Sequence, residues 1–274
     1  MKVLILGAKG MLGFELQRAF AAETCTLWDK EDLDISDADD VKKKLKKLKP
    51  DLVVNAAAYT AVDECENHED VANKVNGDAV GYIATSCADI GAVMMHFSTD
   101  YVFDGEKDGG YTETETPNPL NAYGRTKLQG ESLLQEATTR FYLIRTSWLY
   151  GRNGKNFVDM MLTAAREKRV LRVVNDQHGC PTYAKDLADA AYRLVREQAP
   201  FGIYHLVNSG STTWFDFAKK IFAYKKLDVP VEAIATNDFP RLAKRPKISI
   251  LQNTKAPALR HWEAALQEYL TTKG

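Results

Sequence analysis

The chain has 274 residues, of which 27% are charged and 45% hydrophobic, and its formal net charge is -1 at pH 7. This ordinary globular balance excludes a disordered chain, is enough for a sizeable core, and gives no electrostatic reason to bind nucleic acid. No apolar run is long enough to span a bilayer or to form the core of a signal peptide, so we expect no membrane association. The cysteines lack the spacing of a zinc site, which predicts reduced thiols in a cytoplasmic protein. They are Cys25, Cys65, Cys87 and Cys180.

The first predicted elements are a strand, a glycine-rich turn and a helix. Residues 3–6 form a short apolar run, typical of a strand buried on both faces, and Gly7, Gly10 and Gly13 follow it. At the start of a βαβ unit, such a turn lets the backbone approach a pyrophosphate, which the helix N-terminus attracts. The spacing GxxGxxG differs from the commoner GxGxxG. Its position still favours phosphate binding over a simple strand-to-helix turn.

The second predicted strand, residues 24–28, ends at an acidic residue, Asp29. A carboxylate at this position accepts hydrogen bonds from the adenosine ribose hydroxyls of a dinucleotide. Lys30 follows directly and offsets the repulsion of a 2'-phosphate, so the choice between NADH and NADPH stays open.

Residues 33–35 are interpreted as a short strand segment whose Asp34 can touch the adenine, with the edge of a turn as the alternative. Ser36 and Asp39 resemble a capping box for a helix over residues 37–48, whose lysine-rich face we expect to be solvated.

The third predicted strand, residues 51–55, opens into Ala56, Ala57 and Ala58. Small side chains at the carboxyl end of a parallel strand leave room for a flat cofactor across the sheet, although close packing explains them nearly as well.

A helix over residues 71–90 is predicted next, with Asn76 on it, and then a strand over residues 93–97. That strand delivers Ser98 and Thr99 to the same edge of the sheet. Either hydroxyl can hydrogen-bond a substrate oxygen, or simply satisfy the end of the strand.

A second helix is expected to begin just before Tyr123, with Asn121 as its N-cap. Tyr123 and Lys127 then lie one turn apart on one face. A nearby ammonium favours the phenolate, so we expect Lys127 to bring the pKa of Tyr123 towards neutrality, where the phenol can exchange a proton. Taken alone, such a pair is more often part of an amphipathic helix than of a site.

Beyond the strand at residues 141–145, the strict alternation of strands and helices loosens. Arg241, Lys244 and Arg245 cluster near the end, where guanidinium groups can pair with diphosphate oxygens, and an exposed basic loop is the alternative. The pattern predicts an α/β fold: a Rossmann-type doubly wound parallel sheet over residues 1–147, then a smaller mixed α/β domain over residues 148–274 with segments returning to the sheet.

The glycine turn, Thr99 and the Tyr123/Lys127 pair fall in the order found in short-chain dehydrogenase/reductases. The chain resembles their extended, sugar-nucleotide branch, most closely the dTDP-4-dehydrorhamnose reductase family. The segments that carry the resemblance are NAAAYTAV at 55–62, STDYVF at 98–103, PLNAYGRTK at 119–127, RTSW at 145–148, NDQHGCPT at 175–182 and KRP at 244–246.

The resemblance implies a reductase that uses NADPH or NADH to convert dTDP-6-deoxy-L-lyxo-4-hexulose into dTDP-L-rhamnose. Hydride goes to the 4-keto carbon, Tyr123 protonates the alkoxide and Thr99 hydrogen-bonds the carbonyl. Lys127 holds the nicotinamide ribose. With the residues named above, the predicted cofactor site comprises Gly7, Gly10, Met11, Leu12, Gly13, Asp29, Asp34, Ile35, Ala56, Ala57, Ala58, Tyr59, Thr60, Asn76, Tyr123 and Lys127. The predicted sugar-nucleotide site comprises Thr99, Asp100, Trp148 and Arg245.

Some members of the family form dimers around Mg²⁺ held by glutamates. Glu15 matches one such position, but Lys185 stands where another Glu is needed, and an ammonium repels a divalent cation. We therefore expect no metal site, and a monomer or a weak homodimer.

Two other functions are compatible with the same superfamily. The first is another sugar-nucleotide 4-ketoreductase, an epimerase or a dehydratase that uses the same cofactor. The dehydratases place an Asp-Glu pair directly after the threonine, whereas here Asp100 is followed by Tyr101, which favours reduction without elimination. A second alternative is a non-catalytic regulatory subunit that binds the cofactor, because the partner of methionine adenosyltransferase resembles this family. The complete set of Thr99, Tyr123 and Lys127 disfavours it.

Overall fold

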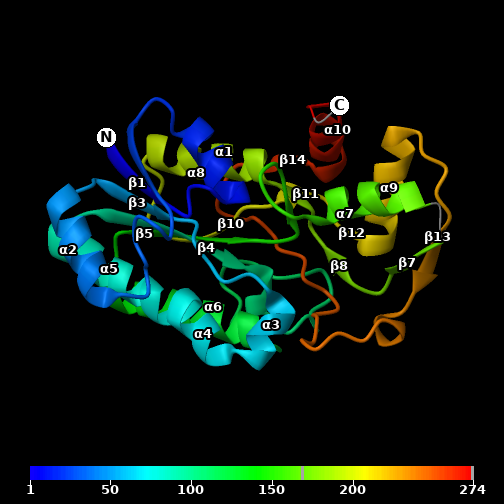
Figure 1. Cartoon of the computed structure of the whole chain (residues 1–274), viewed down its shortest axis with the longest axis horizontal. Coiled ribbons are helices and arrows are strands. Elements are labelled where there is room, and N and C mark those ends of the chain that lie inside the picture. The colour runs from blue at the N-terminus through cyan, green and yellow to red at the C-terminus, as the bar shows by residue number, and fades with distance from the viewer. Residues whose placement is uncertain (168–169, 273–274) are drawn as a thin grey trace.

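The computed structural model describes residues 1–167 and 170–272. Its centre is a parallel sheet in the order β10-β5-β4-β3-β1-β2 (Figure 1). The order reverses between β1 and β3, and in open α/β sheets a ligand binds at the carboxyl ends of the strands at such a point. The strands are β1 Lys2–Leu6, β2 Thr24–Trp28, β3 Leu52–Asn55, β4 Val93–Thr99, β5 Phe141–Thr146 and β10 Gly202–His205.

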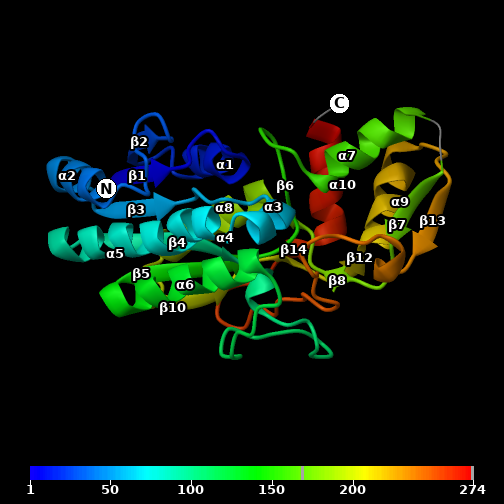
Figure 2. The ribbon, with the colours of Figure 1, turned by 60° about the horizontal axis from the view of Figure 1, so that its bottom comes forward.

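Helices cover both faces of this sheet, as the two views show (Figures 1 and 2). Side chains alternate along β1, so that Val3 and Ile5 join one core and Leu4 and Leu6 join the other. All four are almost fully buried, which explains the continuous apolar run in the sequence. One face carries α1 Met11–Ala19 and α8 Ala184–Arg196, and the other carries α2 Ala38–Leu48, α5 Ala79–Ile90 and α6 Ala122–Ala137.

The helix that the sequence predicts over residues 71–90 is divided in the structure. After the short helix α3 (Val62–Asn67) come α4 (Glu69–Asn73), a π-helical turn at Lys74–Asp78, and then α5. The wide turn lies against α6, where a Cβ on Gly130 would stand 2.2 Å from the carbonyl oxygen of Asn76. π-Turns within helices often occur at functional sites.

A smaller lobe of short strands and the helices α7, α9 and α10 lies beside the carboxyl edge of the sheet (Figure 1). Its core is aromatic, with Tyr150, Phe217, Trp262 and Tyr269 all buried. The elements are β6 Leu149–Tyr150, α7 Phe157–Ala164, β7 Leu171–Val174, β8 His178–Gly179, β9 Thr182–Tyr183, β11 Asn208–Ser209, β12 Thr212–Thr213, α9 Trp214–Lys225, β13 Val231–Ile234, β14 Leu259–His261 and α10 Trp262–Thr272.

Two local predictions near Asp34 are wrong. Residues 33–35 form no strand, because Asp34 accepts hydrogen bonds from the backbone and hydroxyl of Ser36 and closes a turn. The cap of α2 is Asp37, whose Oδ1 accepts from the amides of Asp39 and Asp40 at 3.1 and 3.0 Å. Asp37 replaces Ser36 as the cap because the serine hydroxyl is already bonded to Asp34.

Among residues 1–167 and 170–272, no helix is long and apolar enough to cross a membrane.

Candidate active site

The glycine turn lies where the strand order reverses, between the ends of β1 and β3. Gly7 has φ +73°, and a Cβ on it would stand 2.8 Å from the backbone nitrogen of Ala57. A Cβ on Gly13 would stand 2.1 Å from the carbonyl oxygen of Gly7. Only glycine fits either position. Gly10 caps α1 without a side-chain hydrogen bond, which leaves the helix N-terminus suited to a phosphate.

Asp29 lies at the end of β2 and is fixed by backbone amides of the glycine turn and of its own turn. Its carboxylate accepts from the amides of Lys9 and Lys30, both at 2.9 Å. The ammonium of Lys9 pairs with Glu31 at 2.9 Å, so a cation lies near the expected ribose position. The carboxylate of Asp34 accepts a hydrogen bond from the hydroxyl of Ser36, and Ile35 is buried in the core.

Asn76 holds the backbone of Tyr59 in place. Its Oδ1 accepts from the Tyr59 amide at 2.9 Å, and its Nδ2 donates to the Tyr59 carbonyl at 3.0 Å and to Thr126 at 3.3 Å. The side chain is only 1% exposed. The role expected for Asn76 therefore changes from contact with the cofactor to support of the segment that would contact it.

Helix α6 begins as the sequence predicts. Asn121 caps it by accepting from the amide of Gly124 at 2.8 Å, and its Nδ2 donates to the Lys244 carbonyl at 2.8 Å. The Tyr123 ring meets that of Tyr101 edge to face, with centroids 5.9 Å apart. The cap thus joins the helix of Tyr123 to the basic segment near the end of the chain.

Lys127 is 1% exposed and points inward to the sheet. Its Nζ donates to the Phe97 carbonyl at 2.7 Å and lies 3.1 Å from Nε2 of His96. Burial lowers the pKa of Lys127 to about 8, against the opposing charge of Glu131.

The pKa of Tyr123 departs from the prediction. Burial and the carboxylate of Asp100 raise it, and a hydrogen bond with Thr99 opposes the rise only in part. The expectation that Lys127 brings this pKa towards neutrality is therefore wrong for this structure, because burial dominates and the lysine nitrogen is bonded elsewhere.

Thr99 and Asp100 lie together at the end of β4. The Thr99 hydroxyl donates to Asp100 Oδ1 at 2.9 Å and accepts from the Tyr101 amide at 3.1 Å. Burial raises the pKa of Asp100 to about 7, while hydrogen bonds from Ser249 and Thr99 lower it. Burial therefore favours the protonated form of this carboxyl group.

A cavity of about 990 Å³ opens between the sheet edge and the smaller lobe. Thr60 and Tyr101 line its sheet side, and Trp214 and Gln177 line the other. Four cationic residues also line it: Arg172, Arg241, Lys244 and Arg245. The walls therefore combine aromatic faces with positive charge, which suits a flat ring joined to phosphates.

Trp148, predicted to meet the sugar nucleotide, lies against Trp214. The two rings stack at 3.5 Å with an angle of 7° between their planes. Trp148 has φ +45°, a strained value for a residue with a large side chain, and a Cβ on Gly179 would stand 2.3 Å from its indole. Trp214 also lines the cavity, which could not be predicted from the sequence because the residue looks like the start of an ordinary amphipathic helix.

Arg245 is already paired with a carboxylate. Its Nη1 and Nη2 bond the two oxygens of Asp63 at 2.6 and 3.0 Å, and Arg241 lies 3.8 Å from the same group. Lys244 is exposed and makes no ion pair with any residue that the structure describes. Lys244 and Arg241 are therefore better placed than Arg245 to pair with a ligand.

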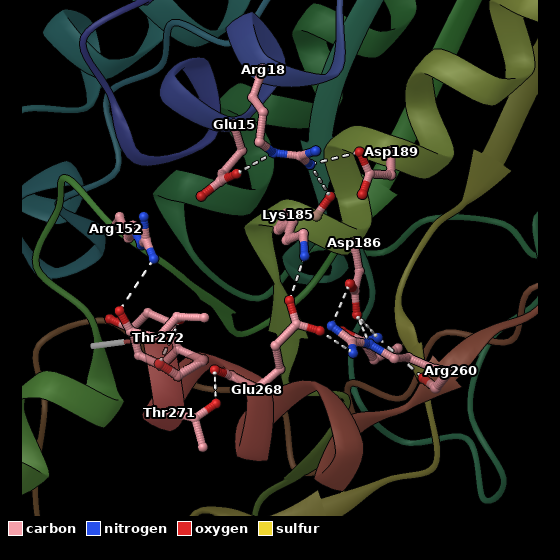
Figure 3. Close-up of polar contacts among 12 residues, drawn as sticks. Glu15, Arg18, Arg152, Lys185, Asp186, Asp189, Arg260, Glu268, Thr271 and Thr272 are labelled. Atoms are coloured by element: carbon pink, nitrogen blue, oxygen red, sulfur yellow. Dashed lines mark hydrogen bonds and ion pairs between the residues drawn. The ribbon is translucent and has the colours of Figure 1, made fainter. Parts of the chain in front are cut away.

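The residues around Glu15 do not suit a divalent cation. Glu15 is 3% exposed and pairs with Arg18 at 3.0 Å, while Lys185 bonds Glu268, which also accepts from Arg260 at 2.5 Å (Figure 3). An ammonium and two guanidinium groups thus occupy the places next to these carboxylates. In the described part of the chain, no three His, Cys, Asp or Glu side chains are grouped to hold a metal.

The central sheet is parallel and has a glycine turn at its reversal point, with Thr99, Tyr123 and Lys127 around the same edge. This arrangement defines a Rossmann-type oxidoreductase.

Comparison with known proteins defines the family. The family model described as the RmlD substrate binding domain matches residues 1–273. The dTDP-4-dehydrorhamnose reductase of Escherichia coli K12 is 38% identical, over 98% of this chain and 97% of its own length. The spore coat polysaccharide biosynthesis protein SpsK of Bacillus subtilis is 41% identical, over 98% and 96%. This chain belongs to the dTDP-4-dehydrorhamnose reductase family.

Solved structures agree with this assignment. A dTDP-4-dehydrorhamnose reductase from Clostridium acetobutylicum has a TM-score of 0.97 at 40% identity, covering 100% of this chain and 99% of its own. The enzyme from Bacillus anthracis, in complex with NADP, has a TM-score of 0.96 at 36% identity, covering 99% of both chains. WbmG of Bordetella bronchiseptica, in complex with NAD and UDP, is 15% identical and shares the fold, with a TM-score of 0.85 over 98% of this chain and 93% of its own.

Proposed function

We propose that this chain reduces the 4-keto group of dTDP-6-deoxy-L-lyxo-4-hexulose with NADPH or NADH and so forms dTDP-L-rhamnose. The observation that carries the proposal is the placement of Thr99, Tyr123 and Lys127 around one sheet edge. That edge adjoins the glycine turn on one side and the basic, aromatic cavity on the other.

The cofactor supplies hydride to the 4-keto carbon when it is bound. The glycine turn and the N-terminus of α1 hold its pyrophosphate, and Asp29 holds the adenosine ribose. Ala56, Ala57 and Ala58, with Tyr59 and Thr60, line its path across the sheet. The cation of Lys9 beside Asp29 makes both cofactors acceptable, because it can turn from Glu31 to a 2'-phosphate.

Tyr123 acts as the proton donor. Its raised pKa keeps the phenol protonated at neutral pH, as a general acid requires, and the proton goes to the alkoxide oxygen as hydride arrives. Thr99 hydrogen-bonds the same oxygen as charge develops on it. Lys127 binds the nicotinamide ribose, which requires its Nζ to turn away from one of its present partners.

The cavity binds the dTDP part of the substrate. Trp214, backed by Trp148, offers a flat face for a ring, and Arg241 with Lys244 pairs with the diphosphate. Arg245 orders this segment through Asp63 and so acts on the substrate indirectly. Asp100 hydrogen-bonds the sugar.

Several further features follow the sequence predictions. We propose residues 1–147 as the cofactor domain and residues 148–274 as mainly the sugar-nucleotide domain, with α8 and β10 returning to the sheet. We also propose a cytoplasmic enzyme, in keeping with four free cysteines, that acts as a monomer or weak homodimer without Mg²⁺, nucleic acid or membrane.

The test is a panel of nucleotide-linked 4-keto sugars assayed with NADPH and with NADH. The proposal predicts that nicotinamide absorbance falls with the dTDP-4-keto sugar, stays flat without it, and is unaffected by a chelator. Cofactor binding without oxidation by any sugar in the panel would support the regulatory subunit instead.

A further inference from the structure

A line of three hydrogen-bonded groups runs through the buried floor of the site to Lys127. The amide of Ala57 donates to Asn55 Oδ1 at 3.2 Å. Asn55 Nδ2 lies 3.1 Å from His96 Nδ1, and His96 Nε2 lies 3.1 Å from Lys127 Nζ. Asn55 and His96 are both 0% exposed, so these contacts are shielded from bulk solvent. The proposed reduction assigns no task to His96.

The hydrogen bond from the Ala57 amide decides which groups donate and which accept along this line. Because Asn55 Oδ1 accepts from Ala57, the NH₂ group of Asn55 faces the imidazole and donates to Nδ1. A neutral imidazole with Nδ1 as acceptor carries its hydrogen on Nε2. That hydrogen points at Lys127 Nζ, which can accept it only as a neutral amine.

A charged Lys127 requires the opposite arrangement. An ammonium has no lone pair, so it must donate to Nε2, and the imidazole hydrogen must then be on Nδ1. The Asn55 amide must turn over so that Oδ1 accepts that hydrogen, and the Ala57 amide loses its partner. When Lys127 gains one proton, the imidazole therefore keeps its single proton but moves it from Nε2 to Nδ1.

We infer that His96 is a positioning residue that couples the charge of Lys127 to the backbone of the cofactor-lining turn at Ala57. The coupling deepens the proposed function and rests on it. Ala57 packs directly against the Gly7 turn, where its nitrogen lies 2.8 Å from the place a Cβ would take. The state of Lys127 is thus communicated to the residues that approach the dinucleotide.

The electrostatic surroundings permit this exchange near neutral pH. Burial and the Lys127 charge lower the pKa of His96 well below its usual range, and a hydrogen bond with the Asn55 backbone opposes this only in part, so the imidazole stays neutral. The charge of Glu131 on α6 raises the pKa of Lys127, and Glu131 itself pairs with Arg145 on β5 at 2.6 Å. With the pKa of Lys127 lowered to about 8, the tautomer is expected to change across the same pH range.

Nitrogen-15 spectra of the imidazole rings of the full chain test the coupling without any substrate. His96 is identified by the signal missing from His96→Gln. We expect its proton to lie on Nδ1 below about pH 7 and on Nε2 above about pH 9, which brackets the titration of Lys127. A tautomer that stays fixed across this range, or an imidazolium that forms within it, would overturn the inference.

Asn55→Asp gives a second, sharper readout. A carboxylate of the same shape accepts from Ala57 and from His96 Nδ1 at once, so it removes the conflict and favours the ammonium of Lys127. The alkaline limb of kcat/KM should move up by about one pH unit, whereas in His68→Gln, at an exposed histidine, it should stay in place.

The outcomes separate this inference from the proposed function. An unmoved alkaline limb in a folded, active Asn55→Asp enzyme contradicts the coupling and leaves the reduction intact. If the native chain oxidises no cofactor with any 4-keto sugar, the reduction fails, and the tautomer of His96 still decides the coupling.

Discussion

The two regions that meet at the cavity hold their polar side chains in different ways. On the sheet side the ion pair between Glu131 and Arg145 has exposures of 0% and 2%, and Ser98 donates to the same carboxylate at 2.5 Å. Near the cavity the pair between Asp63 and Arg245 has exposures of 31% and 17%. Buried, ion-paired groups fix geometry, whereas partly exposed cations and stacked rings adapt to a ligand. Changes on the sheet side should therefore alter rate and stability, and changes in the smaller lobe should alter affinity.

The largest effect is expected for Tyr123→Phe, which removes the proton donor. The value of kcat should fall about a thousandfold, within the usual range for a lost general acid. Cofactor binding, followed by fluorescence, should be retained because the ring still packs against Tyr101. The exposed Tyr82 offers a control, and Tyr82→Phe should keep full activity. A Tyr123→Phe enzyme with near-normal kcat would remove this residue from the mechanism.

The next effect concerns stability. Glu131→Gln leaves the buried guanidinium of Arg145 without its counter-charge and should lower the free energy of unfolding by about 3 kcal/mol. The matched change Glu69→Gln breaks a pair with Arg125 that is nearly half exposed, and should cost under about 1 kcal/mol. Urea unfolding of both variants gives the comparison. Equal losses would show that burial does not distinguish the two pairs.

On the cavity side, Trp214→Ala should weaken binding of the sugar nucleotide. Loss of the flat face should raise KM for the sugar nucleotide about fivefold and leave kcat within about twofold, since stacked aromatic contacts contribute about 1 kcal/mol. Phe215→Ala, at the neighbouring position of α9 but away from the cavity, is the control. A fall in kcat at unchanged KM would place Trp214 in the chemistry instead.

Asp100 gives a smaller, pH-dependent effect with a definite sign. Its pKa is raised from 3.8 to about 7, so the folded chain binds more protons than the unfolded chain between these values. Stability from this group is therefore present at low pH and is lost as pH rises through about 7. Asp100→Asn should raise Tm by about 2 °C or more at pH 8 and by nothing near pH 4.

Asp104 should show the opposite sign. Its pKa is lowered by hydrogen bonds from Tyr111 and Asn118, so its contribution is present above the unfolded pKa and is lost as pH falls. Asp104→Asn should therefore lower Tm at pH 8. The same sign for both substitutions would refute the assignment of opposite environments.

The smallest effect concerns the charge cluster where α1 and α8 meet α10. Mg²⁺ or a chelator should leave the Tm of the native chain unchanged, because Lys185 and Arg260 already neutralise Glu268. Lys185→Glu should lower Tm and make it rise again with added Mg²⁺. A native chain whose Tm depends on Mg²⁺ would contradict the metal-free account.

The sheet half could be predicted closely because its signals are local. The apolar run before Gly7 and the cap Asn121 each fix an element through neighbouring residues, and both are found as predicted. The π-turn at Asn76 could not be predicted, because it depends on contact with Gly130 of a helix far along the sequence.

The smaller lobe was harder to predict from the sequence, because its structure also depends on contacts between residues that are far apart in the chain. Its strands at 178–179 and 182–183 have two residues each, too few to show a period of alternation. Trp214 lines the cavity with Trp148 stacked against it, and Trp148 has a strained backbone and lies far away in the sequence. The role of His96 could not be predicted, because in the sequence it is one polar residue in a buried strand. Its hydrogen bonds to Asn55 and Lys127 join three separate segments.

The most direct test of the central claim follows the hydride itself. The full chain is supplied with NADPH carrying deuterium at the transferred position of the nicotinamide and with the dTDP-4-keto sugar, and the product is analysed by NMR. The account predicts one deuterium on carbon 4 of the sugar, and almost none formed by Tyr123→Phe in the same time. A product without deuterium at carbon 4, or deuterium at another carbon, would contradict the assignment of this chain as a 4-keto reductase.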